Sequence, residues 1–410
     1  MLDIKFIKEN KDLVAQAAKN KNREIDVDEI IRIGEDRKRL RNEVDSLNQQ
    51  RKVAAQTRDV ARGSQIKTEL DSLEKQYAEA DKQFVSLMIK IPNIYSADTP
   101  VGKDEDENKV LRQWGEIPQF NFSPKAHSEI GKDLGIIDSE TAADVTGSRF
   151  TYIKGDLALM QFALIQLVFK LLNEKGFTPV IPPVFVKPAV QNRMARFMTP
   201  EEHFMFPNDD LMLIGSAEHT LGPIYMDKII EEKDLPIKLA GYSTAFRREA
   251  GSYGKDTKGI IRQHQFDKLE MEVFSLPEDS LKIQEELVSI QEEILQTLNL
   301  PYQVVIVCTG DMGFPDYRQI DIETWMPGEN KYRETHSADL TGNFQSRRLN
   351  ARVRRADGTI EPVHMNDATA IALGRALVAI IENYQQADGS VKIPPVLVPY
   401  MNGLGEIRKR

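Results

Sequence analysis

The stretch from Phe246 to Glu270 reads FRREAGSYGKDTKGIIRQHQFDKLE. Strand-like runs over 237–246 and 265–274 flank its polar, glycine-containing loop, which predicts a hairpin of two strands joined by a long connection. Because side chains alternate along a strand, we expect Arg247 and Glu249 on one face. A guanidinium can bind phosphate oxygens and a carboxylate can accept from an adenine amino group, so the pair suits a nucleotide. An exposed hairpin with ordinary ion pairs explains these two residues equally well.

The chain around this hairpin, from about residue 126 to the end, mixes apolar helices with short strand-like segments. We expect helices over 161–174, 285–298 and 370–386, and further strands over 177–185, 211–214 and 303–308. These elements do not alternate strictly as strand, helix, strand. An α+β fold, in which flanking helices cover an antiparallel sheet, is therefore favoured over a doubly wound parallel sheet.

The N-terminal region has a different pattern. After a short amphipathic helix over 1–20, an apolar 3-4 repeat starts near residue 28, breaks at 57–64 around Gly63, and resumes until Pro92 ends it. Two helices of similar length joined by a turn form an antiparallel coiled-coil arm over about 28–91. At about 1.5 Å per residue the arm would project on the order of 45 Å.

Basic residues gather on the first helix and the tip of this arm. Two interpretations stay open: these are solvated flanks with mixed charges such as Glu43 and Asp45, or the arm binds RNA or another partner. The seam residues Arg37 and Arg51 are expected to reach outward and join the basic surface. Its other members are Lys38, Arg39, Arg41, Lys52, Arg58, Arg62 and Lys67.

Composition and charge limit the remaining possibilities. The 410 residues suffice for two or three domains, and we expect an N-terminal domain over 1–100, a linker over 101–125 and a larger domain over 126–410. The net charge of −9 requires that any nucleic acid be held by a local basic surface. The single cysteine, Cys308, and an N-terminus without an apolar leader indicate a soluble cytoplasmic protein that does not bind membranes. The six histidines show no metal-ligand spacing.

Several segments together resemble the class II aminoacyl-tRNA synthetases, and within that class the seryl-tRNA synthetase family. The segments 161–174 and 176–183 resemble class motif 1, Phe246–Ser252 resembles motif 2, and Ala372-Leu373-Gly374-Arg375 resembles motif 3. The N-terminal hairpin looks like the tRNA-binding arm of the family, and the resemblance covers nearly the whole chain. It implies a class II core, a homodimer through motif 1, and a serine–tRNA ligase.

The resemblance also implies roles for ATP-binding residues. Arg247 would bind the α-phosphate and the substrate carboxylate, Glu249 the adenine, and Arg375 the γ-phosphate, which makes these three the catalytic residues. Phe266 would stack on the purine. Glu334 and Ser337 would hold Mg²⁺ on the ATP phosphates, because that ion prefers hard oxygen ligands.

By the same resemblance, the amino-acid pocket would contain Ser216-Ala217-Glu218, Glu270 and Thr369. Glu270 would discriminate serine from alanine by its hydroxyl, since the wrong substrate leaves a buried carboxylate unpaired. This pocket departs from the family pattern, in which Asn-Gly-Ser-Gly is usual where this chain has Asp367-Ala368-Thr369-Ala370. Ser337-Ala338-Asp339-Leu340 likewise replaces Ser-Cys-Ser-Asn. We hypothesise that Asp367 pairs with the ammonium of the substrate; the alternative is a pocket that has drifted.

The implied reaction joins L-serine and ATP into seryl-adenylate and transfers the seryl group to the 3′ end of tRNA(Ser), with tRNA(Sec) as a further candidate and no role for DNA. The motif 2 loop over 251–259 would meet the acceptor stem. Two alternatives remain: a related ligase that charges a carrier protein with a small amino acid, and a catalytically silent paralogue that binds RNA or a partner. The arm argues against the first, and the ATP-facing residues argue against the second.

Overall fold

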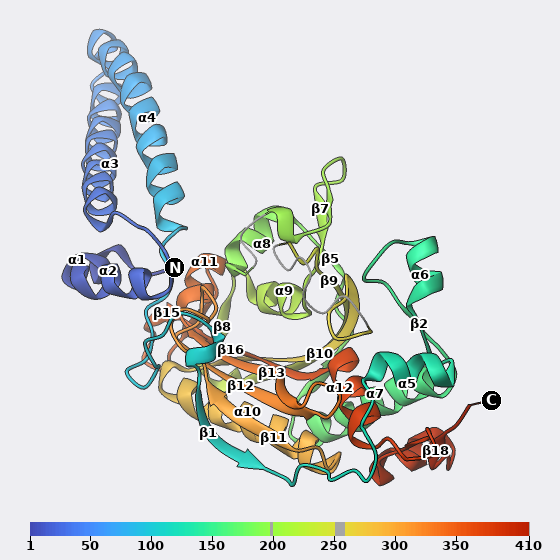
Figure 1. The fold of residues 1–410 in the computed structure, drawn as a ribbon. Coiled ribbons are helices and arrows are strands. Elements are labelled where there is room, and N and C mark those ends of the chain that lie inside the picture. Colours follow the sequence, from blue (N-terminus) through green and yellow to red (C-terminus); the bar gives the residue numbers. More distant parts are fainter. Residues whose placement is uncertain (197–199, 251–258, 410) are drawn as a thin grey trace. The chain divides into compact units, whose positions relative to one another are not determined.

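The structure is a computed structural model that describes residues 1–196, 200–250 and 259–409. The chain forms two compact units, Met1–Tyr95 and Ser96–Arg410 (Figure 1). The first unit is helical, and the second is built on a large sheet. The expected α+β class with an N-terminal helical arm is confirmed.

The first unit begins with two short helices and continues with two long ones. The helix expected over 1–20 is divided at Asn10, whose side-chain amide donates to the Phe6 carbonyl oxygen at 3.0 Å. Asp26 and Asp59 cap the long helices by accepting backbone N–H groups, each at 2.9 Å. The helices are α1 (Ile4–Glu9), α2 (Lys11–Asn20), α3 (Val27–Gln56) and α4 (Val60–Met88).

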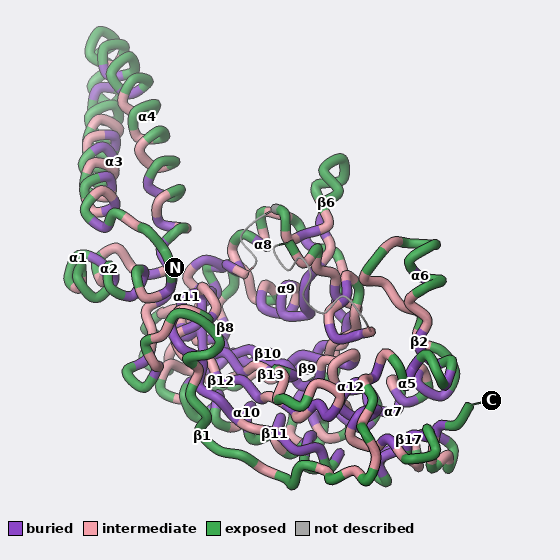
Figure 2. The backbone as a smooth tube through the Cα atoms, viewed as in Figure 1, coloured by how far each residue is buried: buried purple, intermediate pink, exposed green. Residues whose placement is uncertain are grey.

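Helices α3 and α4 pack along a narrow apolar seam and are otherwise exposed (Figure 2). Val44, Ile66 and Leu70 are buried in that seam. Arg37 pairs with Asp81 of α4 at 2.5 Å, and 38% of its side chain remains exposed. Gly63 does not break the helix: α4 begins at Val60, and the Gly63 N–H donates to the Asp59 carbonyl oxygen at 3.0 Å.

The second unit contains an eight-stranded sheet. All neighbouring strands are antiparallel except β4, which runs parallel to β9. Across the sheet the strands are β1 (Lys109–Trp114), β11 (Tyr302–Ile306), β12 (Arg318–Met326), β13 (Lys331–Gly342), β16 (His364–Ala372), β10 (Gln265–Ser275), β9 (Ile237–Phe246) and β4 (Thr178–Val180).

The edge strand β1 lies inside the segment 101–125 that was expected to be a linker. It pairs antiparallel with β11, and the Trp114 ring stacks on the Tyr302 ring with centroids 5.6 Å apart. Its side chains are mostly exposed, so the segment lacks the apolar alternation by which a strand is recognised. This part of the expected linker is therefore a sheet strand.

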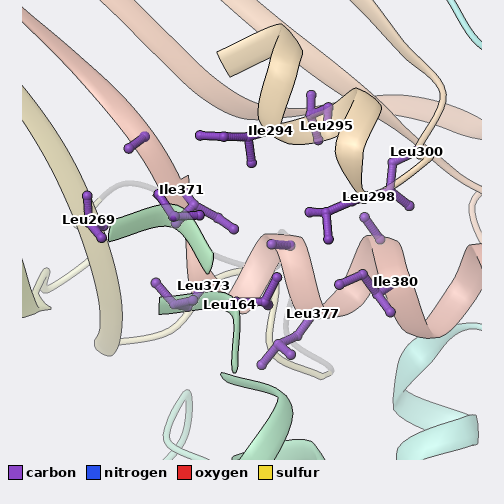
Figure 3. Close-up of a cluster of buried hydrophobic side chains, with 14 of the residues drawn as sticks. Leu164, Leu269, Ile294, Leu295, Leu298, Leu300, Ile371, Leu373, Leu377 and Ile380 are labelled. Carbon is purple, nitrogen blue, oxygen red and sulfur yellow. The ribbon is translucent and has the colours of Figure 1, made fainter. Parts of the chain in front are cut away.

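Three helices form the main core with the sheet: α7 (Gly155–Glu174), α10 (Ser280–Thr297) and α12 (Leu373–Asn383). Leu164, Leu269, Ile294, Ile371 and Leu377 meet there, from α7, β10, α10, β16 and α12 (Figure 3). Helix α7 is also long and apolar enough to span a membrane by length and composition alone, a test that core helices of soluble proteins pass as well. The helix expected over 370–386 starts later, because Ala372 still pairs with Lys268 in the sheet.

Short elements complete the second unit. The remaining helices are α5 (His127–Leu134), α6 (Ser139–Val145), α8 (Pro188–Met194), α9 (Glu218–Leu221) and α11 (Phe344–Leu349). The remaining strands are β2 (Ile137–Asp138), β3 (Tyr152–Ile153), β5 (Phe185–Val186), β6 (Met205–Phe206), β7 (Leu211–Leu213), β8 (Ile229–Glu231), β14 (Arg352–Arg354), β15 (Ile360–Pro362), β17 (Val391–Lys392) and β18 (Glu406–Ile407).

Strand β10 contributes side chains both to this core and to the opposite face of the sheet. Leu269 and Met271 point into the core, so the alternating residues Phe266, Lys268 and Glu270 point to the other side, where they line a cavity. Helix α10 reinforces the strands from the core side. Its buried Gln291 donates to the carbonyl oxygens of Ser337 (2.7 Å) and Thr369 (2.8 Å).

Candidate active site

A cavity of about 290 Å³ lies on the face of the sheet that is turned away from the main core. Ten of the residues predicted from the sequence line it: Glu218, Arg247, Glu249, Phe266, Glu270, Glu334, Ser337, Asp367, Thr369 and Arg375. The eleventh, Ser216, contacts the cavity through a hydrogen bond to Glu270. Residues separated by more than 150 positions in the sequence are thus brought to one place.

Arg247 stands at the entrance of the β9–β10 hairpin, directly after β9. Its Nε donates to the Gly215 carbonyl oxygen at 3.0 Å, and its guanidinium lies 5.3 Å from the centroid of the Phe266 ring. Burial lowers the pKa of the guanidinium. The side chain is therefore held as a preoriented cation over an aromatic ring.

Glu249 also lines the cavity, but strand alternation is not the reason. Strand β9 ends at Phe246, and Glu249 has a left-handed backbone with φ of 53°. Its carboxylate accepts from Arg262 Nη1 at 2.7 Å. The Glu249 carboxylate is therefore held by a loop conformation and by an ion pair across the hairpin, not by the alternation of a strand.

Glu334 and Arg375 form an ion pair at the side of the cavity formed by β13 and α12. Arg375 Nη1 donates to the Glu334 carbonyl oxygen at 2.7 Å and lies 3.2 Å from its Oε1. Burial in the cavity would raise the pKa of the Glu334 carboxyl, but the charge and hydrogen bond of Arg375, together with the charges of Lys268 and Arg247, outweigh this and lower it. About half of the Glu334 side chain remains exposed and open to a ligand.

Glu334 and Ser337 face the same cavity because of an irregularity in β13. Residues three apart on a regular strand point to opposite faces. Here Ile322 pairs with His336 whereas Glu323 pairs with Glu334, so Thr335 is an extra residue in a β-bulge. The bulge rotates Glu334 to the side of Ser337. Ser337 Oγ donates to Asp339 Oδ1 at 2.9 Å.

Glu270 lies at the deep end of the cavity with 1% of its surface exposed. Its Oε1 accepts from Ser216 Oγ at 3.1 Å and from Thr369 Oγ1 at 3.4 Å, and it is paired with Lys268. Burial raises the pKa of the carboxyl, against the effect of Lys268. This end of the cavity offers a carboxylate with two hydroxyl groups, an arrangement that can bind a small polar group.

Arg196 also lines the cavity, and it was not predicted from the sequence. It follows α8, and its guanidinium is almost completely buried next to four carboxylates. Nη2 lies 2.8 Å from Asp367 Oδ2 and 2.8 Å from Asp339 Oδ2. Its other contacts are to Asp316 (3.1 Å) and Glu218 (3.4 Å). The partner of Asp367 in this structure is thus a residue of the chain itself. The only signal in the sequence was indirect: a buried acidic residue such as Asp367 requires a cation.

Burial alone would raise the pKa of the Glu218 carboxyl, but Arg196 holds that pKa well below its usual range. Glu218 is therefore charged. The pKa of Asp367 is instead raised by burial, and the charges of Glu218 and Asp339 act in the same direction against Arg196. Burial and these neighbours favour the protonated form of Asp367, and a further cation beside it would favour the ionised form. The predicted acceptor-stem loop, 251–259, lies outside the described residues except for Gly259.

Comparisons with known proteins agree with this geometry. Residues 1–95 match the family model of the seryl-tRNA synthetase N-terminal domain, and residues 203–384 match that of the class II tRNA synthetase core domain (G, H, P, S and T). The chain is 39% identical to the serine–tRNA ligase of Dictyoglomus turgidum over the full length of both, and 41% identical to that of Thermotoga petrophila over 98% of each.

Solved structures give the same result. The seryl-tRNA synthetase of Pyrococcus horikoshii, solved with ATP, is 37% identical over the whole of both chains, with a TM-score of 0.92. The cytoplasmic serine–tRNA ligase of Naegleria fowleri, solved with AMP, is 29% identical with a TM-score of 0.89; the match covers 100% of this chain and 99% of that one.

Proposed function

The chain belongs to the seryl-tRNA synthetase family, and we propose that its cavity carries out both half-reactions of a serine–tRNA ligase. It activates L-serine with ATP to seryl-adenylate and transfers the seryl group to the 3′ end of tRNA(Ser), with tRNA(Sec) as a further candidate acceptor. The observation that carries the proposal is that one cavity is lined by Arg247, Glu334 and Arg375 and also by Glu270 with its two hydroxyl partners.

Arg247, Glu249, Phe266 and Arg375 would bind ATP. The Arg247 guanidinium would contact the α-phosphate and the serine carboxylate together, which brings nucleophile and electrophile into line. Glu249 would accept from the adenine amino group, and the Phe266 ring would stack on the base. Arg375 would hold the γ-phosphate and stabilise negative charge as pyrophosphate leaves. The attacking nucleophile is the serine carboxylate, so the protein needs none.

Glu334 and Ser337 suit a magnesium ion that arrives with ATP. The bulge of β13 places both oxygen ligands in the cavity, and the Glu334 carboxylate is half exposed. Among the described residues no group of three or more His, Cys, Asp or Glu could hold a metal by itself. Mg²⁺ commonly takes one or two protein oxygens and completes its shell with phosphates and water, where it would neutralise phosphate charge.

The deep end of the cavity would bind L-serine. The serine hydroxyl would donate to Glu270, which already accepts from Ser216 and Thr369. Glu218 and Asp367 would face the amino group. An amino acid without a hydroxyl leaves the buried Glu270 carboxylate with one partner fewer, which is the basis for rejecting alanine and glycine.

The helical arm would bind tRNA, and the enzyme would act as a cytoplasmic homodimer. Arg39, Arg58 and Arg62 are exposed on the arm, which suits contact with a phosphate backbone. For the dimer, Leu159 and Phe162 of α7 expose 48% and 59% of their surface, and Ile181 after β4 exposes 84%. This apolar surface belongs to the motif 1 segments and is available to a second copy.

The test is ATP–pyrophosphate exchange with Mg²⁺ and each of serine, threonine, alanine, glycine and cysteine. Exchange with serine alone supports the proposal. Exchange with another small amino acid favours the carrier-protein alternative, and no exchange with any of them favours the silent paralogue. Omitting Mg²⁺ should abolish exchange, and tRNA(Ser) charging measures the second step.

A further inference from the structure

Three carboxylates stand side by side across the sheet beneath the serine end of the cavity. Asp367 on β16 is directly opposite Asp339 on β13 and directly opposite Glu272 on β10. Like charges in directly opposed positions of neighbouring strands destabilise a sheet. Burial adds to the cost, since Glu272, Asp367 and Asp339 expose 0%, 3% and 7% of their surface.

Arg196 is the counter-charge of this row. It reaches Asp367 and Asp339 from outside the sheet and continues to Asp316 and Glu218, so one guanidinium connects carboxylates from four separate segments. The fork of an arginine suits this task, because it offers five donors in a fixed plane. Neither carboxylate oxygen of Glu272 accepts a hydrogen bond from the described residues.

If all of these carboxyl groups were ionised, they would outnumber the guanidinium; burial and the neighbouring acids accordingly raise the pKa of Asp367 and of Glu272. Four carboxylates contact Arg196, and Glu272 stands beside Asp367 without a cation of its own. Lys268, a second cation that lines the cavity, is paired with Glu270. A ligand that brings one positive charge to Glu218 and Asp367 would therefore be stabilised, although Arg196 is close to both.

We infer that Arg196 is a positioning residue for the amino group of the amino acid: it holds the Glu218 and Asp367 carboxylates in place, and these two carboxylates bind the ammonium. The inference rests on the proposed function, because it takes the acidic end of the cavity as the serine pocket. It also changes the hypothesis for Asp367, which acts together with Arg196 and not as a lone carboxylate.

The test compares two ligands that differ only in the amino group, L-serine and 3-hydroxypropanoate. Their dissociation constants are measured by calorimetry for the full-length protein and for Arg196→Lys, which keeps the charge but loses the fork. We expect serine binding to weaken at least tenfold and 3-hydroxypropanoate binding to change less than twofold. Arg193→Lys is the matched control, because Arg193 lies in α8 close to Arg196 but forms an exposed ion pair with Asp227.

A second variant keeps the inference testable if Arg196→Lys does not fold. Asp367→Asn preserves the shape of the side chain and should weaken serine binding selectively. In the double variant the fold-loss in serine affinity should be smaller than the product of the two single fold-losses, since each change disrupts the same contact. Equal weakening of both ligands, or unchanged serine binding in the folded variants, would overturn the inference.

Exchange activity separates this inference from the proposed function. If the wild-type protein exchanges with serine but the Arg196→Lys variant binds both ligands normally, only the inference fails. If the wild-type protein binds serine in an Arg196-dependent way but exchanges with no amino acid, only the proposed function fails. In exchange assays of an active enzyme, the KM for serine should rise while the KM for ATP stays within twofold.

Discussion

The imidazole of His127 connects the Glu382 carboxylate to the main chain of Ile260. His127 Nδ1 lies 2.8 Å from Glu382 Oε1, and His127 Nε2 accepts the Ile260 N–H at 3.2 Å. Glu382 also accepts the His127 N–H at 2.9 Å and the Gly328 N–H at 2.8 Å. Ile260 follows the motif 2 loop, and Glu382 belongs to α12, the helix that carries Arg375. The contact therefore joins the loop that would meet tRNA to the helix that would hold the γ-phosphate.

Replacing His127 by Phe should destabilise the protein, because the Ile260 N–H and the Glu382 carboxylate lose a buried partner. A buried polar group left unpaired costs about 1–3 kcal/mol, and urea unfolding would measure the loss. Glu382→Gln, which keeps an acceptor oxygen, should cost less. An unchanged unfolding midpoint in His127→Phe would contradict the role of this contact.

Replacing Glu270 by Gln should reduce discrimination between serine and alanine. The neutral amide removes the charged acceptor for the hydroxyl, so kcat/KM for serine should fall about 100-fold, the effect of about 3 kcal/mol. Pyrophosphate exchange with each amino acid measures the ratio. Glu323→Gln, on β12 and outside the cavity, is the matched control and should change neither value. A serine-to-alanine ratio equal to that of the wild type would rule out Glu270 as the discriminating group.

Deleting residues 33–90 should separate the two half-reactions. The sheet and the cavity belong to Ser96–Arg410, so serine-dependent exchange should persist while most charging of tRNA is lost. Affinity of the intact protein for tRNA should fall as salt rises, because basic residues release counterions from the phosphates. Filter binding and aminoacylation measure these effects. Full charging without the arm would show that tRNA is held elsewhere.

Acid should destabilise the fold through His364. Burial lowers the pKa of His364 to about 4, below the 6.5 of an exposed imidazole, so the unfolded chain takes up a proton that the folded chain does not. The neutral His364 imidazole contributes its full share to the free energy of unfolding above pH 6.5. That share falls by about 1.4 kcal/mol per pH unit as the pH drops from 6.5 toward 4. In His364→Gln, the free energy of unfolding should fall less steeply with pH across this range than in the wild type. Parallel curves for the variant and the wild type would contradict it.

The sequence predicted elements whose burial is strongly periodic. The apolar seam of the arm and the strand over 237–246 agree with α3, α4 and β9. It did not predict β1, whose side chains are mostly exposed. It also predicted the start of a helix at Ala370–Ala372, whereas these residues end strand β16. In both cases pairing with a distant strand decides the structure, and no local pattern reports such pairing.

Site residues that belong to a sequence motif were predicted. Site residues that can be recognised only by their contacts in three dimensions were missed. Arg247, Glu270 and Arg375 belong to recognisable segments and line the cavity. Arg196 stands in a segment without a motif, 171 positions before Asp367. The bulge at Thr335, which turns Glu334 to the side of Ser337, depends on the register between β12 and β13 and leaves no trace in the composition of either strand.

The position of β1 decides where the catalytic unit can be cut from the chain. A fragment that starts at residue 126 would lack β1 and leave one side of β11 without a hydrogen-bonded neighbour. An unprotected edge of this kind recruits strands from other molecules, so such a fragment should aggregate. A fragment that starts at Ser96 keeps the edge covered and is the one suited to inhibitor screening or crystallisation.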